Sequence, residues 1–188
     1  DNGDNRNHIP LDVTDSGSVT RAEIASRRLL YDEMLRGRKI LGAAPAIAPR
    51  EGRRIGGRTE LKSEDYCAGR VFEDSVCYSF WFVDIHREGQ AAYIRYITHG
   101  NTPTVRLSNL ISKDLTNLMM AGRDISTTRM ALGSTRVMGT CAIGGQAIGT
   151  AAAQLARNGK KNVREIDIRA LQETLLRDDC YLPGLVSE

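Results

Sequence analysis

The sequence has 188 residues, of which 41% are hydrophobic and 26% charged, with a formal net charge of +3. A chain of this length can bury one core, and its slight positive charge does not favour nucleic-acid binding, which needs clustered lysine and arginine. No apolar run is long enough to span a membrane, so we expect a soluble protein without a membrane span.

The cysteine pattern argues against a metal site. The four cysteines have no CxxC spacing and no histidines clustered around them, and they are Cys67, Cys77, Cys141 and Cys180. Structural zinc sites usually require such spacing, so we expect no metal. Buried free thiols are the expected state, which favours a reducing, cytoplasmic location.

The amino-terminal third predicts a loose segment followed by one helix. Residues 1–19 are rich in Asp, Asn, Gly and Ser, which is typical of loosely attached chain. Because the sequence starts at Asp1 without methionine, we expect its true amino terminus to have been removed or to lie on another polypeptide. The segment Thr20-Arg21-Ala22-Glu23 has the pattern of a capping box and predicts a helix start, and Gly37 predicts its end.

The middle of the chain predicts short helix and strand elements. Ser63-Glu64-Asp65 favours a helix start, whereas residues 78–86 and 91–98 are β-prone. The first of these strands ends at His86, whose side chain can titrate near neutrality and is a candidate for proton transfer, with Asp84 as its orienting partner. A hydrogen-bonded structural role for this histidine is the alternative.

The segment from residue 117 to residue 157 has the composition of half a nucleotide-binding unit. An apolar run of strand length, Leu118–Ala121, leads into the tight loop Gly122-Arg123-Asp124. A second glycine-containing loop, residues 133–140, precedes a helix of mostly small residues that Asn158-Gly159 ends. A strand, a polar glycine loop and a glycine- and alanine-rich helix form the half-unit from which α/β nucleotide sites are built.

The small residues of this helix permit close approach by a ligand. Gly145, Gly149 and Ala153 are spaced by four and share one helical face. Thr140 is expected to cap the first turn, and the positive end of the helix dipole favours a ligand with negative charge. Tight packing of the helix against a sheet is the alternative. At the same helix start, Cys141 is a candidate for a lowered thiol pKa, with a buried inert thiol as the alternative.

Several motifs resemble those of the FAD-dependent oxidoreductases related to the heterodisulfide-reductase flavoprotein subunit. More distantly, they resemble the succinate dehydrogenase and fumarate reductase flavoproteins. Family members typically read NLLVAGR-x-IS, then GS-x-RVM, then a GQAAGTAAA helix, and the matching residues here are 117–126, 133–138 and 145–153. Residues 49–55 resemble the family segment RESRRI, Asp84-Ile85-His86 resembles its DIH element, and the motifs stand in the family's order.

The resemblance implies an α/β fold, namely the carboxy-terminal part of a Rossmann-like FAD-binding fold with part of a mixed α+β substrate domain. We expect residues 1–48 to form an initial segment and a helix of the substrate or cap region, and residues 49–112 to form strands near substrate and flavin. Residues 113–160 are then the strand-loop-helix of the FAD-binding domain, and residues 161–188 a terminal helix and tail.

The resemblance also assigns roles to individual residues. The loop at residues 122–124 would lie against the ribityl and pyrophosphate part of FAD, and residues 136–138 along the isoalloxazine edge. The helix from Thr140 would direct its dipole at the pyrimidine end of the ring. Arg54 would face the flavin or an anionic substrate group. The expected catalytic residues are His86 and Arg54, and the expected cofactor-binding residues are Arg50, Gly122, Arg123, Asp124, Ser134, Arg136, Val137, Met138, Thr140, Cys141 and Gly145.

Flavoproteins of this kind bind the adenosine half of FAD through an amino-terminal βαβ unit with a glycine-rich turn, which this sequence lacks. We therefore expect a second polypeptide that carries that half, or a longer precursor, or a fragment of a complete enzyme. Alone, the chain should hold FAD poorly and expose an apolar patch. The expected activity is hydride or electron transfer with a small-molecule substrate. The alternative is a non-catalytic assembly or regulatory subunit of a flavoprotein-like complex.

Overall fold

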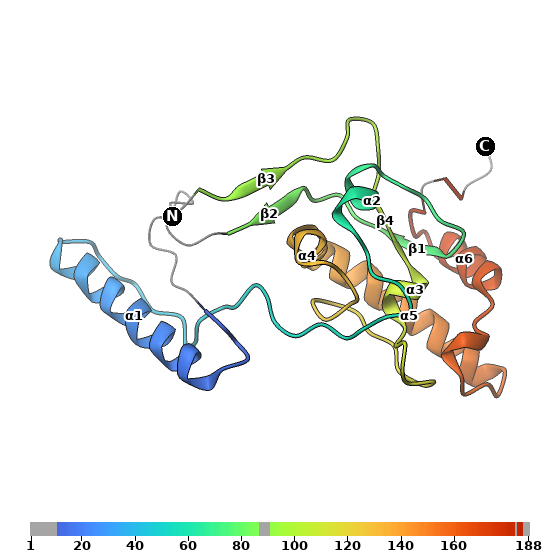
Figure 1. Ribbon diagram of the computed structural model, residues 1–188, viewed down its shortest axis with the longest axis horizontal. Helices are drawn as coiled ribbons and strands as arrows, with labels where there is room; N and C mark the ends of the chain where they lie inside the picture. The colour runs from blue at the N-terminus through green and yellow to red at the C-terminus, as the bar shows by residue number, and fades with distance from the viewer. Residues whose placement is uncertain (1–10, 87–90, 183, 186–188) are drawn as a thin grey trace. The chain divides into compact units, whose positions relative to one another are not determined.

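A computed structural model describes residues 11–86, 91–182 and 184–185 (Figure 1). The chain divides into two compact units. The first, here called the amino-terminal unit, comprises residues 1–53 and 86–92. The second, the main unit, comprises residues 54–85 and 93–188.

The amino-terminal unit is built on one long helix, α1 (Ser16–Leu35). Its cap is Asp15, whose carboxylate accepts hydrogen bonds from the Gly17 and Ser18 N–H groups. The expected helix start at Thr20 was therefore wrong, because Asp15 supplies the cap earlier in the chain and the Thr20 hydroxyl instead donates to the Ser16 carbonyl. Gly37 ends the helix as predicted, with a φ of +83° that favours glycine.

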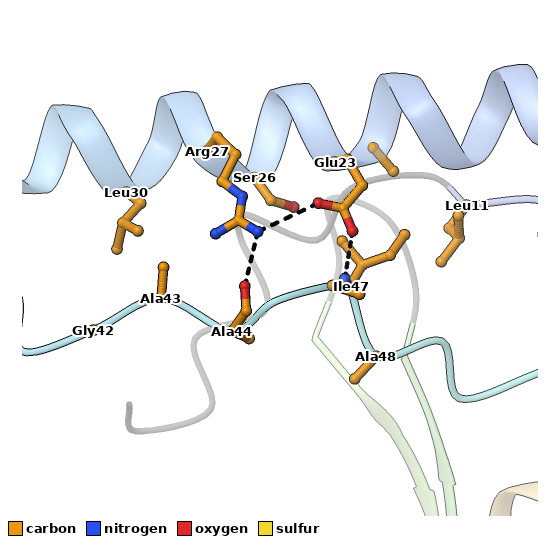
Figure 2. Close-up of a pocket in the computed structure, with 12 residues that line it drawn as sticks. Leu11, Glu23, Ser26, Arg27, Leu30, Gly42, Ala43, Ala44, Ile47 and Ala48 are labelled. Atoms are coloured by element: carbon orange, nitrogen blue, oxygen red, sulfur yellow. Dashed lines mark hydrogen bonds and ion pairs between the residues drawn. The ribbon is translucent and has the colours of Figure 1, made fainter.

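An extended segment, residues 42–48, lies beside α1 and is held there by polar contacts (Figure 2). The Arg27 guanidinium donates to the Ala44 carbonyl at 2.8 Å, and the Glu23 carboxylate accepts from the Ile47 N–H at 2.6 Å. Within α1, Ala22 is the buried residue. The large apolar side chains that α1 exposes are Ile24, Leu29, Tyr31, Met34 and Leu35.

The main unit contains two small antiparallel sheets (Figure 1). One pairs β1 (Ser75–Tyr78) with β4 (Thr104–Arg106), and the other pairs β2 (Val83–Ile85) with β3 (Tyr93–Arg95). The mixture of helices and strands agrees with the expected α/β class, although both sheets have only two strands. The predicted strand over residues 78–86 is interrupted, because the chain leaves the first sheet after β1 and joins the second at β2.

The expected strand at Leu118–Ala121 is reduced to one antiparallel bridge between Ile111 and Met119. The helix α3 (Leu107–Leu110) comes immediately before Ile111, so little extended chain is left for pairing. The Met120 N–H still donates to the Leu110 carbonyl at 2.7 Å, and Met120 is buried. The apolar run thus supplies the core without forming a strand of its own.

Part of the loop expected at residues 133–140 is helical, forming α4 (Arg129–Thr135). Thr128 caps this helix by accepting a hydrogen bond from the Ala131 N–H at 3.3 Å. Gly133 lets α4 pack closely on β2, because a Cβ there would lie 2.7 Å from Ile85 Cδ1 and 2.9 Å from the Asp84 carbonyl oxygen. The sequence signal for this helix was the Thr128 cap, which the loop expectation overlooked.

The long helix α5 (Met138–Arg157) contacts β1 and the last helix, α6 (Ile168–Arg177). Asp167 caps α6 as predicted, with its carboxylate accepting from the Ala170 N–H at 3.1 Å. Gly159, with a φ of +64°, follows the end of α5, also as predicted. Remaining short helices are α2 (Ser63–Cys67) and the 3-10 helix η2 (Val163–Glu165). The core beneath α5 and α6 is apolar and includes Val76, Val105, Ala147, Ala151, Leu171 and Leu175.

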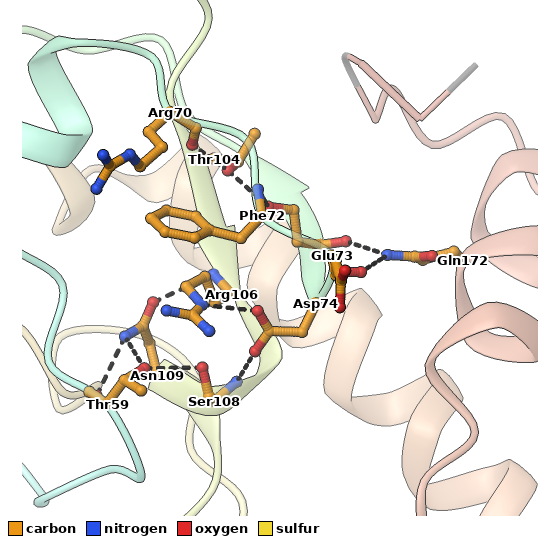
Figure 3. A network of polar contacts seen from close by, with 11 residues as sticks. Thr59, Arg70, Phe72, Glu73, Asp74, Thr104, Arg106, Ser108, Asn109 and Gln172 are labelled. Carbon is orange, nitrogen blue, oxygen red and sulfur yellow. Dashed lines mark hydrogen bonds and ion pairs between the residues drawn. The ribbon is translucent and has the colours of Figure 1, made fainter. Parts of the chain in front are cut away.

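A polar network joins β1, β4, α3 and α6 at the edge of the main unit (Figure 3). The Arg106 guanidinium donates to Asp74 at 2.6 Å and lies over the Phe72 ring, 4.3 Å from its centroid. The Ser108 N–H donates to the second Asp74 carboxylate oxygen at 3.1 Å. From α6, Gln172 donates to the carbonyl of Glu73 at 2.7 Å.

Candidate functional site

Two of the predicted motifs lie side by side in the main unit. The chain that follows Arg54 runs beside residues 124–128, and the Ile55 N–H donates to the Asp124 carbonyl at 2.8 Å. Further along, the Leu61 N–H donates to the Ser126 carbonyl at 2.9 Å. The RESRRI-like segment therefore reaches the loop at residues 122–124 through backbone hydrogen bonds. Arg54 itself is half-buried at the start of this contact.

A second pair of motifs is joined by a side chain. Arg136, in the GS-x-RVM-like segment, donates from Nη2 to the backbone carbonyl of Asp84 in the DIH-like segment at 2.8 Å. The same two segments approach closely at Gly133. Val137 and Met138 follow directly, and the Met138 side chain is 89% exposed. The expected isoalloxazine-edge residues therefore begin at an anchored arginine and end at an exposed methionine.

The loop at residues 122–124 has the conformation that its glycine predicted. Gly122 has a φ of +102°, a region that side chains other than glycine rarely adopt. Arg123 is exposed and Asp124 half-buried. Asp124 Oδ1 is buried and has no hydrogen-bond partner in the part of the chain that the structure describes.

Cys141 lies near this loop, on the first turns of α5. Burial raises the pKa of the Cys141 thiol, with Arg123 lowering it and Asp124 raising it further. Its Sγ lies 3.5 Å from the Thr135 carbonyl oxygen, to which the thiol donates. Of the two alternatives for this thiol, the lowered pKa is wrong and the buried thiol is favoured, because burial outweighs the effect of the nearby positive charge.

The first turn of α5 is organised differently from the prediction. Its cap residue is Val137, which provides no side-chain hydrogen bond. Thr140 is not the cap, because its hydroxyl is buried and lies 2.9 Å from Ser79 Oγ. Among the described residues, the N-cap side chain therefore satisfies none of the early N–H groups of α5, and the positive end of the helix dipole lies there.

A buried group of hydroxyls lies behind this first turn. The Tyr66 hydroxyl lies 2.6 Å from Ser79 Oγ and donates to the Trp81 carbonyl at 2.7 Å. Burial raises the pKa of Tyr66 to about 12, against the opposing effect of the hydrogen bond with Ser79. Ser134 is also buried close to Tyr66, and its hydroxyl has no hydrogen-bond partner among the described residues. Sequence reasoning missed Tyr66 and Ser79, because nothing in their spacing distinguishes them from ordinary core residues.

The small-residue face of α5 is open. A Cβ added at Gly145 or Gly149 would meet no atom of another described element within 4 Å, and Gly149 and Ala153 are exposed. Among the described residues, no sheet packs on these three positions. Tight internal packing therefore does not account for the small residues, and the predicted close approach by a ligand or partner remains a prediction.

The amino-terminal unit holds two of the expected site residues together. The Arg50 guanidinium contacts His86 Nε2. Because a guanidinium only donates hydrogen bonds, this contact requires Nε2 to be the acceptor, with the ring proton on Nδ1. The same unit also has a groove of about 470 Å³ between α1 and residues 42–48, and no expected site residue lines it (Figure 2).

Three further features concern metal binding, the membrane and the cysteines. Within the ranges that the structure describes, no group of three or more His, Cys, Asp or Glu residues is arranged to hold a metal ion. None of the helices described there combines the length and apolarity that crossing a bilayer requires. All four cysteines are free thiols.

Comparison with known protein families gives a match over most of the chain. A family model described as FAD dependent oxidoreductase matches residues 3–175. This range contains every motif and every expected site residue discussed above. No curated protein and no solved structure matches the chain.

Proposed function

Since the chain belongs to the FAD dependent oxidoreductase family, we propose that it is the carboxy-terminal part of such an enzyme and completes its flavin site. The cofactor of the family is FAD, which when bound exchanges hydride or electrons with a substrate. Family membership implies a Rossmann-like fold, and in this proposal residues 113–160 supply its carboxy-terminal strand-loop-helix. The closer relationship to heterodisulfide-reductase flavoproteins is part of the proposal.

The observation that carries the proposal is the convergence of the family motifs in the main unit. The Ile55 N–H bonds to the Asp124 carbonyl, and Arg136 bonds to the Asp84 carbonyl, each at 2.8 Å. Segments far apart in the sequence are thus fixed relative to one another around the first turn of α5 and the loop before α4. A cofactor site needs this kind of rigid support for the groups that contact the ligand.

The polar groups of this region fit a flavin cofactor. Three buried oxygens have no hydrogen-bond partner among the described residues, and they are Asp124 Oδ1, Thr127 Oγ1 and Ser134 Oγ. Leaving such an atom unpaired costs about 1–3 kcal/mol, so a bound polar group that paired with one would stabilise the fold. The open face at Gly145 leaves room for a flat ring, and the uncapped start of α5 favours its electron-rich carbonyls.

In the proposal, residues 122–124 hold the ribityl and pyrophosphate part of FAD, with Arg123 balancing phosphate charge. Arg136, Val137 and Met138 line the isoalloxazine edge. Ser134, Thr140 and Cys141 form the adjoining wall, where buried side chains support the backbone that contacts the ring. Each of these roles uses a side chain or backbone group of the main unit.

The proposed catalytic residues act on protons and charge. His86 transfers a proton, and Arg50 selects its tautomer through the contact with Nε2. Arg54 holds an anionic group of the small-molecule substrate, for which its planar and permanently charged fork is suited.

We further propose that the adenosine half of FAD binds to residues outside this chain, on a second polypeptide. Exposed apolar side chains at the first turn of α5 support a surface that a partner covers, because Phe80 is 52% and Met138 89% exposed. The working protein is then a heteromer in which two polypeptides close over the cofactor.

The test is purification of the native protein with its partners under mild conditions, followed by an absorbance spectrum and a flavin-to-protein ratio. A yellow complex with stoichiometric FAD is expected, and a colourless intact complex would overturn the proposal. Arg123→Ala should weaken FAD binding, whereas Arg169→Ala, which removes an exposed arginine on α6, should not.

The alternative, a non-catalytic assembly subunit, is favoured by one observation. Three of the expected contact residues are turned inward, since Arg136 bonds to the Asp84 carbonyl, Thr140 to Ser79, and Ser134 is fully buried. Under this alternative the complex assembles and remains stable without flavin, so the same spectrum separates the two functions.

A further inference from the structure

Three buried hydroxyls connect α2 to the first turn of α5. Tyr66 lies on α2, Ser79 follows β1, and Thr140 lies in the first turn of α5. The Tyr66 hydroxyl is 2.6 Å from Ser79 Oγ, which is 2.9 Å from Thr140 Oγ1. All three residues are at most 3% exposed, so water does not compete for these hydrogen bonds.

The direction of each hydrogen bond in this series of hydroxyls follows from its final acceptor, the Trp81 carbonyl. The Tyr66 hydroxyl lies 2.7 Å from the Trp81 carbonyl, which can only accept, so the single tyrosine proton points there. Ser79 must then donate to Tyr66, and Thr140 must donate to Ser79. The Thr140 hydroxyl proton therefore points toward Ser79 Oγ, and this hydrogen bond fixes the orientation of the Thr140 side chain.

The same tyrosine fixes the segment that lies over the first turn of α5. Phe80 stands between Ser79 and Trp81, both of which Tyr66 holds. A Cβ added at Gly139 would lie 3.1 Å from two atoms of the Phe80 ring, so this ring lies directly against the turn. Trp81 in turn stacks on the ring of Phe82 at 4.7 Å. One buried hydroxyl therefore sets both the Thr140 side chain and the aromatic segment beside it.

We propose that Tyr66 is a positioning residue for the first turn of α5, which it fixes through Ser79 and Thr140 while holding Phe80 against Gly139. The proposal rests on the proposed function, because this turn is the part of α5 that would face the flavin. Its consequence is that Tyr66 affects FAD binding without touching the cofactor.

The first measurement needs no cofactor. Tyr66→Phe keeps the buried ring and removes the hydroxyl, and exchange of the Cys141 N–H, which donates to the Val137 carbonyl at 3.0 Å, should accelerate in the full native protein. Thr104→Val is the matched control, because it removes a buried hydroxyl that contacts Ser75 Oγ at 2.8 Å in the β1–β4 pair. It should leave exchange of the Cys141 N–H unchanged. Unchanged exchange in Tyr66→Phe, or equal acceleration in both variants, would overturn the proposal.

The second measurement is a double-mutant cycle for FAD affinity in the native complex. Tyr66→Phe and Ser79→Ala should each weaken binding by about three- to tenfold, the range expected for one hydrogen bond. The double variant should bind no more weakly than the weaker single variant, because both act through one chain of hydrogen bonds. The visible circular dichroism of the bound flavin should change in both and stay unchanged in Thr104→Val. Fully additive losses would overturn the proposal.

The two measurements separate this inference from the function on which it rests. A native complex that binds no FAD would overturn the proposed function, and the exchange measurement would still decide whether Tyr66 fixes the turn. If the complex binds FAD and both single variants bind it as tightly as the unsubstituted protein does, the proposed function stands and the role of Tyr66 is wrong.

Discussion

Arg136 Nη2 donates a 2.8 Å hydrogen bond to the backbone carbonyl of Asp84, and this bond joins the end of α4 to the middle of β2. The Asp84 carbonyl is also one of the atoms that approach Gly133 most closely. The arginine and the glycine therefore act on the same contact from two sides. The long Arg136 side chain holds the two segments together by its hydrogen bond, and the absence of a Cβ at Gly133 lets them approach closely.

Replacing Arg136 should weaken this contact. Arg136→Ala removes a charged donor from a half-buried site and should lower the free energy of unfolding by about 1.5–3 kcal/mol. Arg136→Lys should recover only part of the loss, because an ammonium lacks the planar fork. Urea unfolding followed by circular dichroism measures both. Arg169→Ala on α6 should change stability by less than about 0.5 kcal/mol, and an equal effect would contradict the role given to Arg136.

Two glycines should respond in opposite directions to the same substitution. Gly133→Ala would place a Cβ 2.7 Å from Ile85 Cδ1 and 2.9 Å from the Asp84 carbonyl oxygen, and should destabilise the chain by about 1–3 kcal/mol. Gly145→Ala would meet no described atom within 4 Å. It should stabilise α5 by about 0.5–1 kcal/mol, because alanine favours the helix. Thermal unfolding of the two variants would show this, and a shift in the same direction for both would contradict the packing described here.

A larger residue at Gly145 separates folding from function. The Cβ of Gly145→Leu would meet no described atom within 4 Å, so the unfolding transition should stay close to that of the unsubstituted protein. If a flat ring or a partner backbone approaches this face, the side chain should block it, and the native complex should lose most of its flavin. Flavin content after purification is the measurement. Full retention of FAD in this variant would show that the cofactor does not approach Gly145.

How far the sequence predicted the structure depended on the range of the interactions involved. Gly37, Gly159 and Asp167 act within one helical turn, and their predicted roles as helix ends and cap are confirmed. Thr140 failed as a cap because its hydroxyl bonds to Ser79, a partner far away in the sequence. Leu118–Ala121 did not form a strand, and only Met119 makes a bridge, with Ile111. Local patterns do not contain such tertiary partners.

The same limit applies to the candidate site. Motif resemblance identified Asp84, Asp124 and Arg136, but the sequence gives no indication that Arg136 bonds to one carbonyl and Ile55 to the other. Tyr66 was not recognised at all, because a tyrosine in a short helix has no sequence pattern that reveals its hydrogen bonds. For Cys141 the sequence left a reactive and a buried thiol open, and burial, which raises its pKa, favours the second.

The network around Asp74 predicts a dependence of stability on pH (Figure 3). Burial alone would raise the pKa of Asp74, but hydrogen bonds from Ser108 and Arg106 outweigh it and hold this pKa below the usual 3.8. A lowered folded-state pKa means that the carboxylate stabilises the fold above about pH 4. This contribution is lost as the pH falls through the lowered value.

Asp74→Asn should therefore reduce stability by about 1–3 kcal/mol at neutral pH, and the difference from the unsubstituted protein should shrink below about pH 4. Urea unfolding at several pH values measures the difference. Asp65→Asn is a suitable control, since it removes an exposed ion pair with Arg70 and should cost less than about 1 kcal/mol. A difference for Asp74→Asn that stays constant down to low pH would contradict the assignment.

His86 offers a prediction about proton transfer in the proposed enzyme. Its Nε2 accepts a hydrogen bond from Arg50, so the neutral imidazole carries its proton on Nδ1. His86→Gln keeps a polar side chain but removes the titrating group, and should slow proton-coupled turnover by about 100- to 10,000-fold. Turnover is expressed per bound flavin, because Arg50, which contacts His86, is itself an expected FAD-binding residue.

The measurement is reoxidation of the chemically reduced native complex by a soluble quinone, which takes up protons as it is reduced. The rate should fall by about 100- to 10,000-fold in His86→Gln. His99→Gln, at an exposed turn residue, should retain the rate of the unsubstituted protein. If His86→Gln keeps that rate, or if its slower rate is matched by an equal loss of flavin, the histidine supports the structure and does not transfer the proton.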